Sequence, residues 1–217
     1  MQHKLVIWGA SGHALVVADA VRLRGEFEVV GFIDDVSPER AGSRFCGATI
    51  LGGREQLDAL AREGVNNLIF GFGNCQARLE LAELARGKGF QLATTVHPRA
   101  VVAADVSVGR GTFIAAGAVV NAAARVGENV IINTGAGVDH ECVIEDGAHI
   151  CPGVHLAGRV SVGRGAWVGI GATVLDGVNI GAGAMVGAGA VVIKDIPDGV
   201  VAYGVPAKVM RKIKSDG

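Results

Sequence analysis

The stretch VGENVIINTGAGVDHECVIEDGAHI (residues 126–150) has an aliphatic residue at every sixth position, and this spacing decides the fold. The spacing continues in both directions through sixteen aliphatic residues without a break. They are Val102, Val108, Ile114, Val120, Val126, Ile132, Val138, Ile144, Ile150, Leu156, Val162, Val168, Val174, Ile180, Val186 and Val192. A repeat this short is typical of a parallel β-helix, in which one flat strand and turn stack on the next. Three six-residue faces make a triangular coil, so residues 18 apart should lie above one another at about 4.8 Å.

The residues before the repeat follow a different pattern, in which short apolar runs alternate with amphipathic segments. We expect strands at 5–8, 28–33, 68–70 and 91–96, and helices at 14–24, 54–63 and 76–86. This alternation predicts a small Rossmann-like α/β unit with a parallel sheet. The predicted domains are 1–96 for that unit, 97–196 for the β-helix and 197–217 for a C-terminal capping tail.

Composition excludes several classes of protein. The formal net charge is −1 and no basic stripe is present, so a nucleic-acid partner is not expected. We expect no signal peptide, because the first residues lead into a short strand, and no run of about 20 apolar residues suggests a membrane span. Its four cysteines show neither CxxC pairing nor zinc spacing, which is consistent with a reducing cytoplasm. Cys142 and Cys151 lie within the repeat and are predicted to be small apolar fillers of the coil.

A glycine turn, Gly9-Ala10-Ser11-Gly12-His13, follows the first predicted strand. It does not match the GxGxxG fingerprint, so NAD is not predicted, but a glycine turn before a helix N-terminus suits a phosphate. Asp34-Asp35 ends the second strand 22 residues beyond Gly12, where acids commonly bind a ribose or a base. The alternative is a tight structural turn with two solvated acids, and the residues alone leave both possibilities open.

His140 is the candidate general base. It lies two residues past Val138, outside the core register, between Asp139 and Glu141. A histidine beside carboxylates on a rigid wall suits proton transfer near neutral pH. The alternative is an exposed turn histidine without a role in chemistry. Metal binding is not predicted, because no second ligand has a spacing that stacks beside His140.

The 18-residue coil relates His140 to other residues. Gly158 is 18 residues further on, so it should stack over His140, with its N–H facing the same reacting carbon. His149 is nine residues away, half a coil, and should lie at a different corner. Asn133 precedes His149 by 16 residues and should share its corner. We therefore predict a composite site in which His140 of one chain faces Asn133 and His149 of a neighbouring chain.

These motifs together resemble the left-handed β-helix (hexapeptide-repeat) acyltransferases, and more closely the NeuD/PglD-like sugar acetyltransferase family. The resemblance covers nearly the whole chain. It is carried by the glycine turn, by Asp34-Asp35, by the stretch from Asn133 to His149 and by Gly204-Val205-Pro206-Ala207-Lys208. Left-handedness is implied by this resemblance, since the repeat period does not show it.

The resemblance implies a homotrimer with acetyl-CoA between the β-helices of adjacent subunits, no metal, and a nucleotide-linked amino sugar as partner. It implies that His140 is the catalytic base, that Glu141 orients the His140 ring, and that the N–H of Gly158 donates to the oxyanion. The residues that it implies for the cosubstrate are His149, Gly158, Ile170, Gly204, Pro206 and Lys208. Those that it implies for the sugar nucleotide are Gly9, Ser11, Gly12, His13, Asp34, Asp35 and Asn133.

The predicted function is acetyl-CoA-dependent N-acetylation of a nucleotide-linked 4-amino-4,6-dideoxy sugar. Cys142 follows the apolar repeat and should point inward, and no serine lies beside His140, so direct transfer is favoured over an acetyl-enzyme. UDP, GDP and dTDP sugars all remain open. Two alternatives are O-acetylation of sialic acid or another sugar, and a β-helix binding protein without catalytic activity.

Overall fold

The structure is a computed structural model that describes residues 2–213. The last four residues of the predicted capping tail, 214–217, lie outside the described residues. The chain divides into two compact units, 1–98 and 99–217. No helix within residues 2–213 has the length and apolar character needed to cross a membrane.

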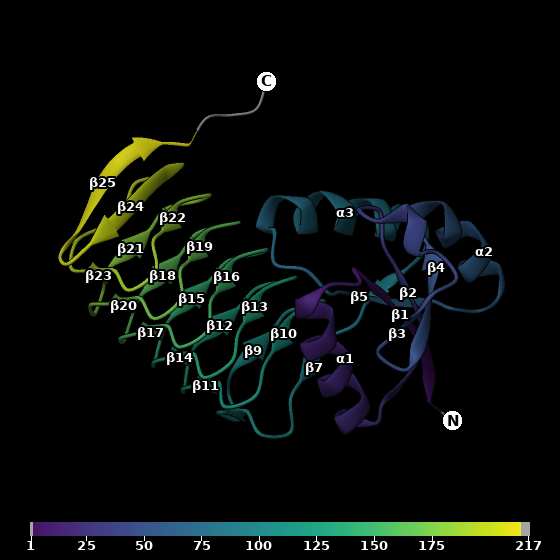
Figure 1. Ribbon diagram of the computed structural model, residues 1–217. Coiled ribbons are helices and arrows are strands. Elements are labelled where there is room, and N and C mark those ends of the chain that lie inside the picture. Colours follow the sequence, from purple (N-terminus) through teal and green to yellow (C-terminus); the bar gives the residue numbers. More distant parts are fainter. Residues whose placement is uncertain (1, 214–217) are drawn as a thin grey trace. The chain divides into compact units, whose positions relative to one another are not determined.

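The first unit is a six-stranded sheet with helices, in the order β3-β4-β2-β1-β5-β6 (Figure 1). All neighbouring strands are parallel except β3 and β4. The strands of this sheet are β1 (His3–Trp8), β2 (Phe27–Ile33), β3 (Arg44–Phe45), β4 (Ala48–Gly52), β5 (Asn67–Phe70) and β6 (Gln91–Leu92). β7 (Thr95–Val96) follows β6 in the chain and does not belong to this sheet. The helices of the unit are α1 (Gly12–Arg24), α2 (Leu57–Arg62) and α3 (Cys75–Gly87), with 3₁₀ turns at Pro38–Arg40 and Arg54–Gln56. The predicted Rossmann-like α/β unit is confirmed.

The core of this unit is built from the apolar runs of the sequence. Trp8, Leu68 and Phe70 from the sheet are buried against Leu57 and Leu60 from α2. Each fully buried side chain of this size contributes about 1.5–3 kcal/mol to folding.

Local interactions set the ends of the elements and explain three differences from the prediction. The expected helix 54–63 begins as a 3₁₀ turn, where Glu55 accepts the Gly53 N–H at 2.8 Å. The expected strand 91–96 is divided into β6 and β7. The β3–β4 hairpin was not predicted. Its turn residues Cys46 and Gly47 both have positive φ, as tight hairpin turns require.

The second unit is a three-sided parallel β-helix of two-residue strands that ends in two longer strands (Figure 1). One sheet runs β10-β13-β16-β19-β22-β24-β25, the second β8-β11-β14-β17-β20-β23 and the third β9-β12-β15-β18-β21. The strands are β8 (Val101–Val102), β9 (Ser107–Val108), β10 (Phe113–Ile114), β11 (Val119–Val120), β12 (Arg125–Val126), β13 (Ile131–Ile132), β14 (Gly137–Val138), β15 (Val143–Ile144), β16 (His149–Ile150), β17 (His155–Leu156), β18 (Ser161–Val162), β19 (Trp167–Val168), β20 (Thr173–Val174), β21 (Asn179–Ile180), β22 (Met185–Val186), β23 (Val191–Val192), β24 (Val200–Gly204) and β25 (Ala207–Lys212).

The register confirms the 18-residue coil, since Val120 pairs with both Val102 and Val138. The repeated aliphatic residues fill the interior and are buried from Ile114 to Val192. From Thr112 to Ala190, the position two residues before each is also buried and holds a small residue or valine, as at Cys142. Cys142 and Cys151 are buried and free, so their prediction as fillers of the coil is confirmed.

The turns of the coil use a left-handed residue at every sixth position. Ten of these residues are glycines: Gly111, Gly117, Gly135, Gly147, Gly153, Gly165, Gly171, Gly177, Gly183 and Gly189. The exceptions are Ala123, Asn129, Glu141 and Arg159. A side chain at such a position costs roughly 1–2 kcal/mol, so the exceptions call for a reason.

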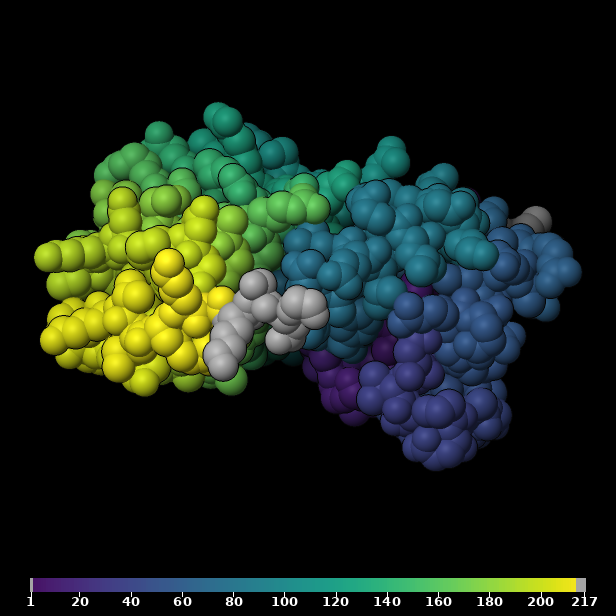
Figure 2. All heavy atoms as spheres, turned by 90° about the horizontal axis from the view of Figure 1, so that it is seen from above, coloured from purple at the N-terminus to yellow at the C-terminus, as the bar shows by residue number. Residues whose placement is uncertain are grey.

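The coil ends in an antiparallel hairpin. β24 adds a parallel rung to β22, and β25 turns back to pair with β24. Figure 2 shows the hairpin in yellow at the end of the β-helix, beside the last coils. Its exposed apolar side chains are Tyr203, Val205, Val209 and Met210.

Candidate active site

His140 lies on the turn between β14 and β15, and its side chain is about half exposed. Its Nδ1 is 3.1 Å from Oε2 of Glu141. An ionised carboxylate at this distance favours the tautomer with the proton on Nδ1, which leaves a lone pair on Nε2. Nε2 is therefore the atom that can accept a proton from a bound molecule.

Asp139 holds the turn that carries His140. Its Oδ1 accepts the His140 N–H at 2.8 Å and the Asn121 amide at 2.9 Å. These two hydrogen bonds lower the pKa of Asp139, because both stabilise its charged form. Asn121 was not predicted from the sequence, although it lies 18 residues before Asp139 and the stacking rule would have found it.

Gly158 stacks against the His140 ring, as predicted. A Cβ built on Gly158 would lie 2.5 Å from Cε1 and 2.6 Å from Nε2 of His140. Only glycine therefore leaves room for the ring in this orientation. Within residues 2–213 no hydrogen bond uses the Gly158 N–H. The site thus places a proton acceptor beside a backbone N–H, a combination that suits acyl transfer.

Arg159 and Asp176 complete this corner of the coil. Arg159 forms one ion pair with Glu141, at 3.8 Å, and a second with Asp176. Neither residue was predicted as part of the site. The signal was present in the spacing, since Arg159 is 18 residues after Glu141 and Asp176 is 18 after Gly158.

Asn133 and His149 form a second polar pair. The Asn133 Nδ2 lies 3.1 Å from the His149 Nε2, and both residues are buried. The Asn133 Oδ1 accepts the Thr134 N–H at 2.8 Å, which turns the amide nitrogen towards the histidine. The prediction that they share a corner is confirmed. His149 begins β16, on a different sheet from β14, so a composite site with His140 stays a prediction.

The first unit holds a cavity of about 450 Å³ where the parallel strands β1 and β2 end. It brings together four predicted residues, Gly9, Ser11, Asp34 and Asp35. The remaining lining residues are Trp8, Ala10, Val36, Ser37, Arg40, Arg54, Phe72, Asn74, Ala77 and Leu81. Gly12 and His13 follow on α1 and do not line the cavity. Ligands of open parallel sheets bind at this edge.

The two acids of the cavity are paired with arginines. Asp35 forms an ion pair with Arg54 at 2.9 Å and accepts the Trp8 Nε1–H at 3.1 Å. Asp34 is buried and lies 3.5 Å from Arg40. Asp34 is therefore shielded from solvent, whereas Asp35 is exposed, so nucleotide binding at the two acids stays a prediction. Arg40 and Arg54 were not predicted, because no spacing in the sequence links them to the acids.

The glycine turn has a structural requirement of its own. Gly9 has φ +118°, and a Cβ there would lie 3.1 Å from the backbone of Gly71. Burial and the charge of Arg78 lower the pKa of His13 to about 4. His13 is therefore neutral at pH 7.

Of the six residues expected to contact CoA, His149 and Gly158 are buried and the other four are exposed. Ile170 lies on the turn after β19, whereas Gly204, Pro206 and Lys208 lie on the β24–β25 hairpin. Only the family resemblance assigns these residues to CoA, and their roles stay predictions. Across residues 2–213 there is no group of three His, Cys, Asp or Glu that would hold a metal ion.

Comparisons with known proteins cover nearly all of the chain. The PglD N-terminal domain family matches residues 4–85, and the curated proteins contain no match. A crystal structure of a perosamine N-acetyltransferase variant from Caulobacter crescentus, in complex with CoA and GDP-perosamine, is 42% identical. Its TM-score is 0.91, and the match covers 96% of this chain and 97% of that chain.

Two further structures are similar. The acetyltransferase domain of PglB from Neisseria gonorrhoeae, in complex with acetyl coenzyme A, is 36% identical with a TM-score of 0.90. That match covers 97% of this chain and 100% of the domain. WeeI from Acinetobacter baumannii is 26% identical, with a TM-score of 0.86 and coverage of 96% and 100%. The chain therefore belongs to the PglD-like family of hexapeptide-repeat sugar acetyltransferases, and its coil is a left-handed parallel β-helix.

Proposed function

We propose that this protein is an acetyl-CoA-dependent N-acetyltransferase that acts on the amino group of a nucleotide-linked 4-amino-4,6-dideoxy sugar. The observation that carries the proposal is the His140–Glu141 pair stacked against Gly158, in a chain 42% identical to an enzyme crystallised with CoA and GDP-perosamine. GDP is accordingly the first nucleotide to test, ahead of UDP and dTDP.

The reaction is a direct transfer. The sugar amine attacks the thioester carbonyl of acetyl-CoA, and Nε2 of His140 takes the proton that the nitrogen loses. The N–H of Gly158 stabilises the oxyanion, a role that contributes about 3–4 kcal/mol in comparable enzymes. The C–S bond then breaks, and the thiolate of CoA takes the proton back from His140.

Cys142 does not serve as a nucleophile in this mechanism. It is fully buried in the coil, and its thiol lies 3.2 Å from the Ala157 carbonyl oxygen. Burial raises its pKa, which disfavours the reactive thiolate. A ternary complex of enzyme, acetyl-CoA and sugar nucleotide is thus favoured over an acetyl-enzyme.

The two substrates occupy different parts of the chain in this proposal. The nucleotide binds the cavity of the domain at 1–96, with Gly9, Ser11, Gly12 and His13 near phosphate and the Asp34-Asp35 pair near ribose or base. Asn133 contacts the sugar. CoA binds along the β-helix domain at 97–196 and the tail at 197–217, through His149, Ile170, Gly204, Pro206 and Lys208.

The working enzyme is a homotrimer with its active sites between subunits. This proposal is supported by the placement of His140 and His149 on different sheets, which leaves a neighbouring chain to complete each site. The four free cysteines are consistent with a cytoplasmic enzyme.

The test is thiol release from acetyl-CoA in the presence of GDP-, UDP- and dTDP-4-amino sugars and free sialic acid. We expect turnover on one amino sugar nucleotide, and a loss of about 100- to 10,000-fold in His140→Ala. His3→Ala removes an exposed histidine of β1 and serves as the control with normal turnover.

Turnover on sialic acid alone would replace the proposal with O-acetylation. Absence of CoA binding would favour the β-helix binding protein without catalytic activity. Activity of His140→Ala within a few-fold of wild type would remove His140 as the base.

A further inference from the structure

Two charged residues occupy left-handed turn positions that the coil mostly gives to glycine. Glu141 has φ +58° and Arg159 has φ +59°, and they stack at the corner that carries His140. The next residue in that column is Gly177. Because a side chain there costs roughly 1–2 kcal/mol, the two charged residues are not explained by the requirements of the backbone.

The contacts of these residues form a continuous chain that ends at the His140 ring. Oε2 of Glu141 lies 3.1 Å from His140 Nδ1 and 3.8 Å from Arg159 Nη1. Arg159 also pairs through Nη2 with Asp176. The other oxygen of Asp176 lies 2.9 Å from the position of a Cβ on Gly158. This series of contacts thus begins at the His140 ring and ends at Asp176, and both lie next to Gly158.

Stability does not account for this network. The side chains of Glu141 and Arg159 are 56% and 55% exposed. Ion pairs at such exposure are worth about 0–1 kcal/mol of stability. The orientation of the His140 ring is a stronger reason for the network than stability. A change of about 1.4 kcal/mol in transition-state free energy changes a rate tenfold. An exposed Glu141 without a second partner would leave His140 for other rotamers and for water.

We propose that Arg159 is a positioning residue, anchored by Asp176, that holds the Glu141 carboxylate on Nδ1 of His140 and so directs Nε2 across Gly158. This inference rests on the proposed function, in which His140 accepts the proton of the amine. It assigns to Arg159 an effect on turnover and none on the binding of either substrate.

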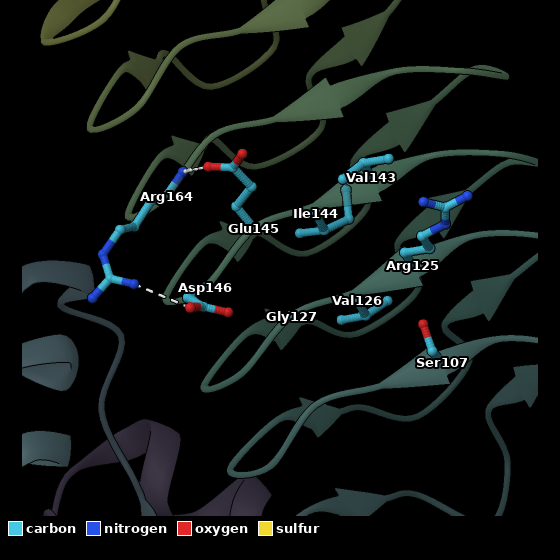
Figure 3. A pocket seen from close by; sticks show the side chains of 9 residues that line it. All are labelled: Ser107, Arg125, Val126, Gly127, Val143, Ile144, Glu145, Asp146 and Arg164. Carbon is cyan, nitrogen blue, oxygen red and sulfur yellow. Dashed lines mark hydrogen bonds and ion pairs between the residues drawn. The ribbon is translucent and has the colours of Figure 1, made fainter.

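The molecule contains a matched control at another corner of the same coil (Figure 3). Arg164 pairs with Asp146 at 3.0 Å, and its backbone N–H donates to Glu145 at 2.8 Å. Its side chain is 54% exposed, almost the same as that of Arg159. The cavity of about 410 Å³ that it lines includes no histidine. Removal of Arg164 therefore breaks a similar ion pair without affecting His140.

The first experiment compares steady-state kinetics of Arg159→Met, Glu141→Gln, the double variant and Arg164→Met. We expect Arg159→Met to lower kcat about tenfold, with both KM values within about twofold of wild type. In the Glu141→Gln background the same change should lower kcat less than about twofold, because Arg159 acts through Glu141. Arg159→Lys, which keeps the charge, should recover part of the lost rate, and Arg164→Met should behave as wild type.

A second measurement does not depend on activity. The ¹⁵N shifts of the His140 ring report its tautomer, and wild type should show the proton predominantly on Nδ1. Arg159→Met and Asp176→Asn should both increase the other tautomer, and Arg164→Met should not. If wild type acetylates none of the amino sugars, the proposed function fails while the spectra still decide the role of Arg159.

Three results would overturn the inference. The first is an Arg159→Met effect that multiplies fully with that of Glu141→Gln. The second is a rise in either KM, which would make Arg159 a binding residue. The third is a His140 ring whose tautomer is the same in wild type and Arg159→Met.

Discussion

The two units of this protein bring their functional residues together in different ways. In the β-helix, the groups around His140 are one coil apart, so addition of 18 to a residue number finds a neighbour. In the α/β unit, Trp8 meets Asp35 across 27 positions and Asp35 meets Arg54 across 19. No period relates these separations. In a repeat, the sequence spacing predicts which residues are in contact. In a parallel α/β sheet, the sequence predicts only the edge at which the functional residues gather.

The comparison also separates two kinds of function. The coil supplies the groups assigned to chemistry, and the cavity of the α/β unit supplies those assigned to recognition of the nucleotide. Changes in the coil corner should therefore alter kcat, and changes in the cavity should alter the KM of one substrate.

Among the changes that test this separation, Gly158→Ala is expected to have the largest effect. The added Cβ would lie 2.5 Å from the His140 ring and 2.9 Å from Asp176, both ends of side chains that can move away. The protein should still fold with the added Cβ, but the His140 ring is displaced from its position. We therefore expect kcat to fall about 100- to 1,000-fold. Thermal unfolding should show a midpoint within a few degrees of wild type.

The matched glycine is Gly109, where a Cβ would meet the backbone of Gly127 at 2.4 Å. Backbone in a stacked coil cannot move aside, so Gly109→Ala should lower the unfolding midpoint and leave kcat of the folded fraction unchanged. If Gly158→Ala lowers stability as much as Gly109→Ala, its loss of activity would no longer indicate the position of the ring.

A smaller effect, confined to one substrate, is expected from Asp35→Asn in the cavity. The change weakens the contacts with Arg54 and Trp8 that shape the site. We expect the KM of the sugar nucleotide to rise about tenfold, with the KM of acetyl-CoA unchanged. Asp58→Asn breaks an exposed ion pair with Lys88 in the same unit and is the control. Equal changes in both KM values would contradict the separation of recognition from chemistry.

The smallest effect is a difference in the pH dependence of stability. The pKa of His13 falls from 6.5 in the unfolded chain to about 4 in the folded one, so the unfolded state binds more protons between these values. The contribution of neutral His13 to the free energy of unfolding is complete above pH 6.5 and is lost as the pH falls towards 4. The loss amounts to about 2 kcal/mol by pH 4.5.

Urea unfolding of wild type and His13→Gln at pH 7 and pH 4.5 measures this contribution. The variant should lose less stability than wild type over that interval. Asp139 in the coil has a lowered pKa, so its contribution is present above pH 3.8 and is lost only below it. Equal losses in the two proteins would show that His13 is as accessible to protons when folded as when unfolded.

The sequence predicted most where the repeat applies. The six-residue period placed Gly158 against His140 and Asn133 beside His149, because each coil repeats the geometry of the last. The same period relates Arg159 to Glu141 and Asp176 to Gly158, but spacing alone does not show which stacked side chains form ion pairs. In the α/β unit the strand ends placed Gly9 and Asp34 at one edge. Arg40 and Arg54 could not be foreseen there, because their positions depend on the path of loops.

The hairpin at the end of the coil also has a consequence for solubility. A stack of parallel strands ends in unpaired backbone groups, which would accept a further rung from another molecule and propagate into a fibre. β25 covers the edge of β24 in the antiparallel sense, so the next strand that it offers runs in the wrong direction for another coil. Lys208, Arg211 and Lys212 add like charges along that outer strand. On this sheet, the strand that completes the fold also prevents it from growing.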